Sequence, residues 1–182
     1  MTSDSIFVDW NPDNHPALFH LLQLLYLMLP IYFANMAPPF VRYWRGWNPA
    51  ISAPQLGSHK TVVGFVLGIV TAVAAAFAQS RAGWSGSLVA YEQWILMGMA
   101  MGAGAMLGDS AKSFFKRRLE IAPGKSWIPF DQLDFVAGGL LALLPWIRLS
   151  VLDIAAIFAL SFLGAICVNH LSFYSGIREA KW

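Results

Sequence analysis

The chain has 182 residues, of which 57% are hydrophobic and only 12% are charged, and its formal net charge is +2. A soluble domain usually carries about twice this charged fraction, so much of the surface must face something other than water. The small net charge gives no support for a nucleic-acid partner. The composition therefore predicts an integral membrane protein.

Five apolar segments approach the roughly 20 residues that a helix needs to cross the hydrocarbon core of a bilayer. In chain order they are Ala17–Phe33, Thr61–Ala78, Leu88–Leu107, Leu133–Leu149 and Val151–Tyr174. They predict an all-α, polytopic membrane protein of about five transmembrane helices, forming a single domain over residues 1–182. Residues 1–16 are polar and lack the basic start of a cleaved signal peptide, so the first span is expected to remain in the protein.

Proline and glycine modify two of these spans. Pro30 is expected to kink the first span or to end its regular part, and Pro38 is expected to stop it. The third span contains two overlapping small-xxx-small patterns, formed by Gly98, Gly102, Gly104 and Gly108. Small residues at this spacing let another helix approach closely in lipid, so we expect a packing role for these glycines.

The basic residues are distributed unevenly among the segments that connect the spans. The first loop, the third loop and the C-terminal tail contain ten Lys and Arg residues, whereas the other segments contain two. Because basic residues favour the cytoplasmic side of a membrane, the N-terminus is predicted to lie outside. Residues 1–16 would then be an extracytoplasmic tail, and residues 34–60 and 108–132 would be large cytoplasmic loops.

One segment, residues 108–134, contains four of the 10 acidic residues and five of the 12 basic residues. Asp109 lies close to membrane depth, where an isolated carboxylate is costly and usually has a functional partner. If the start of the fourth span is helical, Asp131 and Asp134 share one of its faces. Converging carboxylates are what a hard cation such as Mg²⁺ requires.

In the same segment, one side of a helical turn would carry Ser113, Lys116 and Arg117, which are spaced at i, i+3 and i+4, and two of these are basic. Such groups can hold the phosphates that a metal also contacts. Acidic groups for a metal and basic groups for phosphate, placed at a membrane surface, suggest phosphoryl or nucleotidyl transfer to a lipid head group. On these features alone, an ordinary solvated loop remains the alternative.

These residues resemble the signature of the membrane CTP:phosphatidate cytidylyltransferases, and more closely that of the smaller CDP-archaeol synthase branch. The matched positions are Gly108, Asp109, Ser113, Lys116, Arg117, Lys125, Pro129, Asp131 and Asp134. Three further stretches agree with that branch: the Lys60-Thr61-x-x-Gly64 element, the tail His170-x-x-x-Tyr174-x-Gly176-Ile177, and a Pro30-x-x-x-x-Asn35-x-x-Pro38 segment. The likeness covers most of the chain from about residue 25 onward.

The resemblance implies a Mg²⁺-dependent enzyme that transfers the cytidylyl group of CTP to a phosphorylated lipid. The products would be pyrophosphate and a CDP-activated lipid of the archaeol or diacylglycerol type. Asp109, Asp131 and Asp134 would hold Mg²⁺ and, with Lys116, would form the catalytic set. The residues implied in nucleotide or phosphate contacts are Asn35, Lys60, Thr61, Ser113, Arg117 and Lys125. Ser113 is equally consistent with a helix-packing role, and Asn35 with a helix cap.

The expected partners are therefore CTP, a phosphorylated lipid and the membrane, with no nucleic acid, and a homodimer remains open. The protein would lie in the cell membrane as a multi-pass protein, with its active site facing the cytoplasm. The alternative function is a small transporter or channel that uses the Asp residues at the span ends. A transporter is expected to show acidic residues at mid-span and repeat symmetry, and the sequence shows neither.

Overall fold

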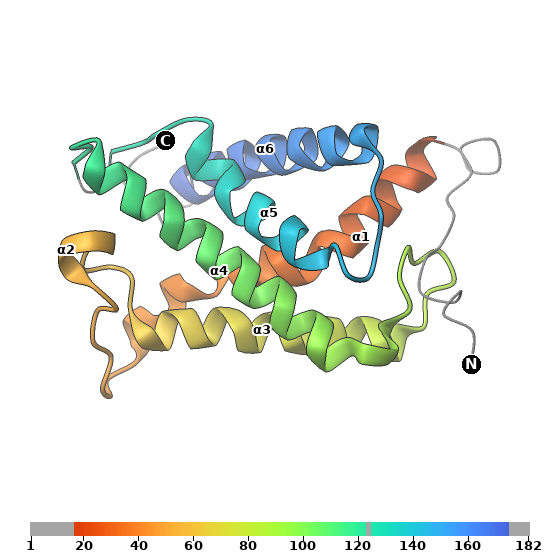
Figure 1. Ribbon diagram of the computed structural model, residues 1–182, viewed down its shortest axis with the longest axis horizontal. Coiled ribbons are helices and arrows are strands. Elements are labelled where there is room, and N and C mark those ends of the chain that lie inside the picture. The colour runs from red at the N-terminus through yellow and green to blue at the C-terminus, as the bar shows by residue number, and fades with distance from the viewer. Residues whose placement is uncertain (1–16, 123–124, 175–182) are drawn as a thin grey trace.

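The computed structural model describes residues 17–122 and 125–174, and these residues form a bundle of helices (Figure 1). The long helices in these ranges are α1 (Ala17–Met36), α3 (Val62–Ala82), α4 (Trp94–Arg118), α5 (Phe130–Leu143) and α6 (Val151–Tyr174). Shorter helices are η3 (Pro38–Tyr43), α2 (Ala53–Leu56) and η4 (Tyr91–Gln93). Within the described ranges, β-structure is limited to a single bridge between Ala50 and Thr61. The all-α prediction is confirmed; the predicted tail, residues 1–16, lies outside the described residues.

Side chains at the helix ends explain where two of the long helices begin. The Thr61 hydroxyl accepts a hydrogen bond from the Gly64 N–H (3.3 Å), and this cap starts α3. Helix α3 ends at Gly83, whose φ of 55° is readily adopted by glycine. A capping box starts α6: Ser150 Oγ accepts from the Asp153 N–H (3.1 Å), and the Asp153 carboxylate accepts from the Ser150 N–H (2.9 Å).

Helix α1 continues through Pro30 to Met36, so the proline does not end the helix as one reading of the sequence had allowed. A proline removes one N–H and leaves the carbonyl four residues earlier without its helical partner. Here that carbonyl belongs to Tyr26, and the Gln79 side chain of α3 donates a hydrogen bond to it (2.5 Å). Satisfying backbone groups between helices is what makes an internal proline tolerable in a membrane protein.

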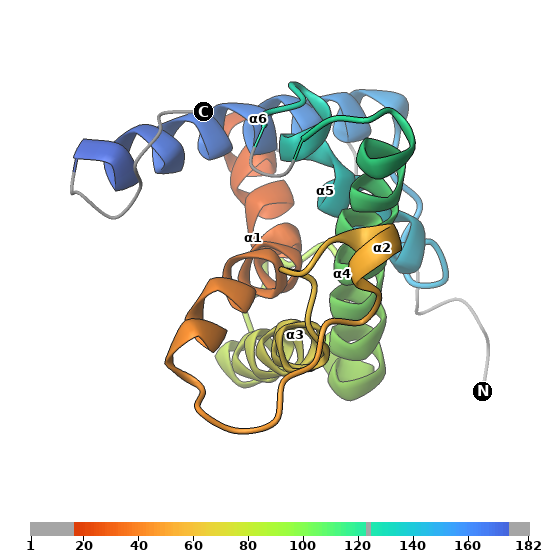
Figure 2. The ribbon, with the colours of Figure 1, turned by 90° about the vertical axis from the view of Figure 1, so that its left-hand side faces the viewer.

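Helix α4 contacts α1, α3 and α5, and Figure 2 shows it along one side of the bundle, with α1 and α3 on the same side of it. Its glycines let two neighbours approach closely. A Cβ atom at Gly98 would lie 2.6 Å from the Val73 Cα of α3. On the other face of α4, a Cβ atom at Gly104 would overlap the carbonyl of Gly138 in α5. The predicted packing role of these glycines is confirmed, and α4 and α5 meet backbone to backbone.

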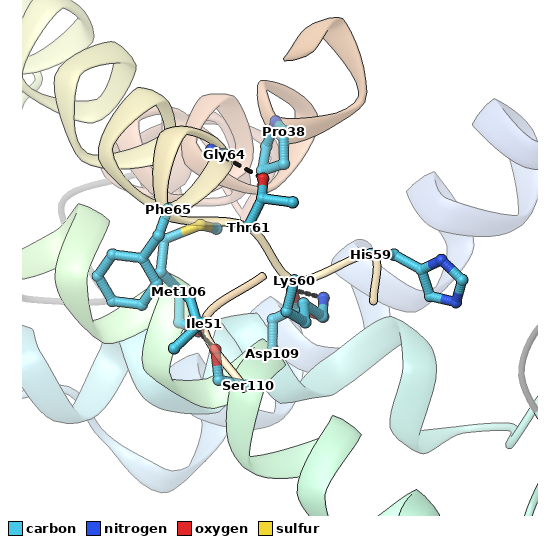
Figure 3. Close-up of a pocket in the computed structure, with 10 residues that line it drawn as sticks. All are labelled: Pro38, Ile51, His59, Lys60, Thr61, Gly64, Phe65, Met106, Asp109 and Ser110. Atoms are coloured by element: carbon cyan, nitrogen blue, oxygen red, sulfur yellow. Dashed lines mark hydrogen bonds and ion pairs between the residues drawn. The ribbon is translucent and has the colours of Figure 1, made fainter. Parts of the chain in front are cut away.

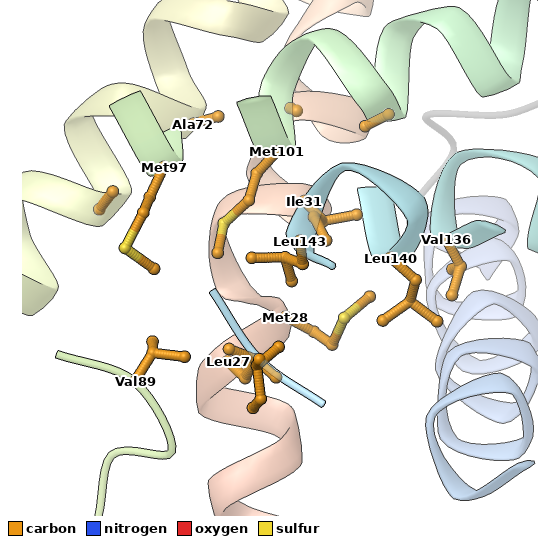
Figure 4. Close-up of a cluster of buried hydrophobic side chains, with 14 of the residues drawn as sticks. Leu27, Met28, Ile31, Ala72, Val89, Met97, Met101, Val136, Leu140 and Leu143 are labelled. Carbon is orange, nitrogen blue, oxygen red and sulfur yellow. The ribbon is translucent and has the colours of Figure 1, made fainter. Parts of the chain in front are cut away.

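The hydrophobic core fills the space between α1, α4 and α5 (Figure 4). Its fully buried side chains include Leu27, Met28, Ile31, Met97, Met101, Val136 and Leu143. In lipid, close packing of such side chains between helices, and not their removal from water, favours helix association. The core therefore fixes α5 against α4, and it is these two helices that carry Asp109, Asp131 and Asp134.

Within the described residues, three helical segments are long and apolar enough to cross a membrane: Ala17–Tyr43, Val62–Ala82 and Val151–Leu171. The last turn of α4 contains Lys116, Arg117 and Arg118, which lowers its apolar character. Helix α5 has 14 residues and spans about 21 Å, less than the roughly 30 Å of a hydrocarbon core. The structure thus agrees with a membrane protein, and the count of five spans stays a prediction.

The connecting segments alternate between the two ends of the bundle (Figure 1). Helix α2, in the first loop, lies at the same end as the C-terminus of α4, and the two helices are in contact. The turns after α3 and after α5 lie at the opposite end. The loops with most of the basic residues therefore share one end of the molecule.

A buried polar cluster joins α1 to α6 at the opposite end. His20 Nε2 lies 2.6 Å from Asp153 Oδ1, and His20 Nδ1 lies 3.2 Å from Gln23 Oε1. The Gln23 side chain donates a hydrogen bond to the Gly86 carbonyl (2.7 Å), in the turn between α3 and α4. These contacts tie the start of α1 to the start of α6 and to that turn.

Candidate functional site

Three carboxylates converge on one ammonium group where α4 passes the start of α5. Lys112 Nζ lies 3.1 Å from Asp109 Oδ1, 3.4 Å from Asp131 Oδ1 and 2.9 Å from Asp134 Oδ2. Asp109 and Lys112 are one helical turn apart on α4, and Asp131 and Asp134 are one turn apart on α5. The expectation that the two α5 carboxylates share a face, and that Asp109 joins them, is met by this geometry.

Two further lysines pair with the two more exposed carboxylates, Asp109 and Asp131, which we call the outer carboxylates. Lys60, which precedes α3, donates a hydrogen bond to Asp109 Oδ2. Lys116 Nζ lies 3.1 Å from each oxygen of Asp131 and also donates to the Lys125 carbonyl. Residues 60 and 109 are 49 positions apart, so the fold itself brings the first loop to the charged segment. We use the name carboxylate cluster for Asp109, Asp131 and Asp134.

The charges of the cluster stabilise one another. Burial raises the pKa of Asp109, but the Lys60 and Lys112 ammonium groups outweigh this effect and hold that pKa below its ordinary value. Burial likewise lowers the pKa of Lys112, and the facing carboxylates outweigh it, so this pKa lies above its usual value. Burial also raises the pKa of Asp131, and the Trp127 N–H and nearby lysines more than offset it. Asp109 and Asp131 are thus carboxylates, and Lys112 is an ammonium, at neutral pH.

A pocket opens beside the cluster, between the first loop, α3 and α4 (Figure 3). It is lined by Pro38, Ile51, His59, Lys60, Thr61, Gly64, Phe65, Met106, Asp109 and Ser110. Lys60 and Asp109 both line this pocket, so it adjoins the carboxylate cluster.

Four other residues predicted for the site are Ser113, Arg117, Lys125 and Asn35. The Ser113 hydroxyl donates to the Asp109 carbonyl (2.9 Å) in its own helix, a contact that fits the packing role left open above. Arg117 is half-buried, and its Nε has no hydrogen-bond partner in the described ranges. The Lys125 side chain is exposed, and Asn35 is half-buried in the last turn of α1. Among the described contacts, none joins the side chains of Arg117, Lys125 or Asn35 to the cluster.

Lys112 is the residue that sequence reasoning missed. The sequence placed Ser113, Lys116 and Arg117 on one side of a helical turn and counted Lys112 only as a loop cation. Its spacing of three residues from Asp109 was the available signal, because residues at i and i+3 of a helix are neighbours. Its contacts with Asp131 and Asp134 depend on how α4 crosses α5, which no local pattern reveals.

The donor atoms of the carboxylate cluster suit a hard divalent cation, because Mg²⁺ prefers carboxylate oxygens. Asp134 Oδ1 is buried without a hydrogen-bond partner in the part of the chain that is described. In that part, no three His, Cys, Asp or Glu side chains are already grouped to hold a metal ion. We attribute this to the Lys112 ammonium, which lies where the carboxylates converge. The carboxylates are therefore suitable ligands for Mg²⁺, but in this structure the Lys112 ammonium lies at the point where they converge.

Comparison with known proteins places this site in a family. The family model described as CarS-like CDP-archaeol synthase matches residues 18–182. The chain is 34% identical to the CDP-archaeol synthase of Methanospirillum hungatei over 166 residues, which cover 85% of this chain and 100% of that relative. It is 30% identical to the CDP-archaeol synthase of Aeropyrum pernix over 183 residues, which cover 96% of this chain and 97% of that relative.

A solved structure supports the same assignment. The fold is similar to that of an intramembrane enzyme for the biosynthesis of archaeal membrane lipids, with a TM-score of 0.70 and 26% sequence identity. The similarity covers 82% of this chain and 94% of that one. These findings favour an enzyme over the transporter alternative and confirm the resemblance drawn from the sequence. The chain belongs to the CDP-archaeol synthase family of membrane enzymes, which are nucleotidyltransferases that use CTP and a lipid phosphate.

Proposed function

We propose that this enzyme uses Mg²⁺ to transfer the cytidylyl group of CTP to a phosphorylated archaeol-type ether lipid at the cytoplasmic face of the membrane. The observation that carries the proposal is the convergence of Asp109, Asp131 and Asp134 beside Lys60 and Lys116. This arrangement offers oxygen ligands for a metal next to cations for phosphate. Both are needed where charged phosphates must be brought together.

In the proposed reaction, an oxygen of the lipid phosphate attacks the α-phosphorus of CTP. The new P–O bond forms as the bond between the α-phosphorus and the bridging oxygen of pyrophosphate breaks, and pyrophosphate leaves with the electron pair. Asp109, Asp131 and Asp134 would hold Mg²⁺, which when bound neutralises phosphate charge and favours in-line displacement. Lys60 and Lys116 lie at the rim of the cluster and would bind phosphate oxygens, which holds the reacting groups in line.

The choice of lipid rests on the relatives, which are CDP-archaeol synthases. The side of the membrane is supported by the positions of the loops. The first and third loops contain eight Lys and Arg residues and lie at the same end of the bundle as the carboxylate cluster. A lipid whose chains lie in the bilayer would present its phosphate at this end.

The activity test uses the purified protein in detergent with CTP, Mg²⁺ and either phosphorylated archaeol or phosphatidate. We expect pyrophosphate release with the archaeol phosphate, a weaker response with phosphatidate, and none after chelation of the metal. Asp131→Ala is expected to lose activity, whereas the exposed Glu92→Gln at the opposite end is expected to retain it. Equal turnover by the Asp131 and Glu92 variants would contradict the metal assignment, and a preference for phosphatidate would contradict the lipid assignment.

The sidedness test places single cysteines at Ser85 and Ser126 in a Cys167→Ala background. Both positions are exposed, and they lie in the second and third loops. In right-side-out vesicles, a membrane-impermeant maleimide is expected to label the cysteine at position 85 and not the one at position 126. Labelling of the cysteine at position 126 would overturn the cytoplasmic placement of the site.

A further inference from the structure

We propose that the Lys112 side chain is the built-in counter-ion of the carboxylate cluster, and that a divalent cation enters the site by displacing it. The inference deepens the proposed function, because it rests on the cluster as the metal site. It assigns to Lys112 a positioning role: it keeps three acidic groups together when no metal is bound. It also makes Lys112 a competitor that sets the affinity for the metal.

The first argument is geometric. One nitrogen atom lies 2.9–3.4 Å from an oxygen of each of the three carboxylates. Mg²⁺ binds oxygen at about 2.0–2.1 Å, so an ion bound to all three carboxylates would lie close to the position of the Lys112 nitrogen. Two cations cannot share that position, both because of overlap and because like charges repel. Binding of the metal by the full cluster therefore requires the ammonium to leave.

The second argument is burial. The side chains of Lys112 and Asp134 are 14% and 7% exposed, so their charges are largely removed from water. A buried carboxylate without a partner is strongly destabilising. Three of them at one point need a cation at all times, including before any metal binds. Lys112 supplies that cation from within the same helix as Asp109.

The third argument separates Lys112 from its two neighbours. Lys60 and Lys116 each pair with one outer carboxylate, and Lys116 is also held by the Lys125 carbonyl. Within the described ranges, the recorded partners of Lys112 Nζ are the three carboxylates alone. A lysine side chain is a point charge on a flexible four-carbon stem, so it can turn away once the metal takes these partners. The displaced ammonium stays at the edge of the site, where a triphosphate would need positive charge.

Metal affinity measured without CTP tests the proposal directly. Mn²⁺ binding is followed by electron paramagnetic resonance for the wild-type protein, Lys112→Met and Arg118→Met. Arg118→Met removes the same charge from an exposed position on α4, where Arg118 lies over the Phe114 ring, and serves as the matched control. We expect Lys112→Met to bind Mn²⁺ at least about tenfold more tightly than the control, since tenfold corresponds to 1.4 kcal/mol of removed competition. Its metal-free thermal midpoint is expected to be lower and to rise more on adding Mn²⁺.

A second measurement uses the unmodified chain, in case Lys112→Met does not fold. Lysine acetylation by acetic anhydride is quantified by mass spectrometry with and without Mg²⁺, and the exposed Lys125 is the internal reference. Displacement predicts that Mg²⁺ increases the acetylation of Lys112 relative to Lys125. Unchanged acetylation of Lys112 under Mn²⁺- or Mg²⁺-saturating conditions would overturn the inference.

The outcomes also distinguish this inference from the proposed function. Equal Mn²⁺ affinity in Lys112→Met and Arg118→Met overturns the role of Lys112 and leaves the metal site in place. Absence of Mn²⁺ binding in every variant overturns both. The expected binding pattern without CTP turnover supports the displacement and contradicts the proposed reaction.

Discussion

The contact between α4 and α5 offers the sharpest test of how the fold supports the site, through Gly138→Ala. Gly138 faces the Gly104 carbonyl, and an added Cβ atom would overlap that carbonyl oxygen. A backbone carbonyl cannot rotate away as a flexible side chain can, so the two helices must separate. Gly138 follows Asp134 by four residues, so the part of α5 that moves also carries a carboxylate of the cluster.

The expected size of the effect follows from two opposing terms. Overpacking a tight contact costs about 1–3 kcal/mol, and overlap with backbone points to the upper end of this range. Alanine is more favourable than glycine within a helix by about 0.8–1.0 kcal/mol. We therefore expect Gly138→Ala to lower the free energy of unfolding by about 1–2 kcal/mol. A shift of about 1 Å in the reacting groups can cost on the order of 10²-fold in rate, so CTP-dependent activity should fall steeply.

Gly164→Ala provides the matched control in the same assays. A Cβ atom at Gly164 of α6 would meet no atom of the described residues within 4 Å, so only the gain in helix propensity applies. Unfolding in detergent and pyrophosphate release are measured side by side for both variants. The reasoning is refuted if Gly138→Ala is as stable and as active as Gly164→Ala, because the helices would then tolerate the added methyl group without moving.

Two further predictions concern the stability of the fold. Asp153→Ala removes the contact with His20 and the hydrogen bond from the Ser150 N–H, and is expected to lower the free energy of unfolding by about 1–3 kcal/mol. The KM for CTP should stay unchanged, because the contact between His20 and Asp153 lies at the end of the bundle opposite the carboxylate cluster. A raised KM would contradict that placement. Thr61→Val removes the cap of α3 and is expected to lower the free energy of unfolding by about 0.5–2 kcal/mol. Thr61→Ser keeps a hydroxyl at the cap and should keep the wild-type thermal midpoint. Equal midpoints for the two variants would exclude the cap as a source of stability.

The helices were largely predictable from the sequence because each apolar run is long enough to form one. The exact ends were less so, because they depend on contacts between distant residues. Helix α1 runs past Pro30 since Gln79, on another helix, donates to the Tyr26 carbonyl. The charged start of the third loop is helical up to Arg118, which extends α4 beyond the predicted end of its span.

The three acidic residues of the carboxylate cluster were predictable from the sequence, but the lysine that lies among them was not. Asp131 and Asp134 lie one helical turn apart, so their common face follows from spacing. The pairing of Lys60 with Asp109 joins two segments that no periodicity relates, and the family resemblance implied only that Lys60 contacts nucleotide or phosphate. The position of Lys112 among the carboxylates depends on the close approach of α4 to α5, and that approach is visible only in three dimensions.

The buried contact between His20 and Asp153 links residues 133 positions apart in the chain. In a protein inserted from its N-terminus onward, the first helix would enter the bilayer long before its partner on the last helix has been synthesised. Until then the imidazole must rely on neighbours such as Gln23, or on water, at the membrane surface. Completion of this contact would therefore be a late step of assembly, in which α6 locks α1 in place.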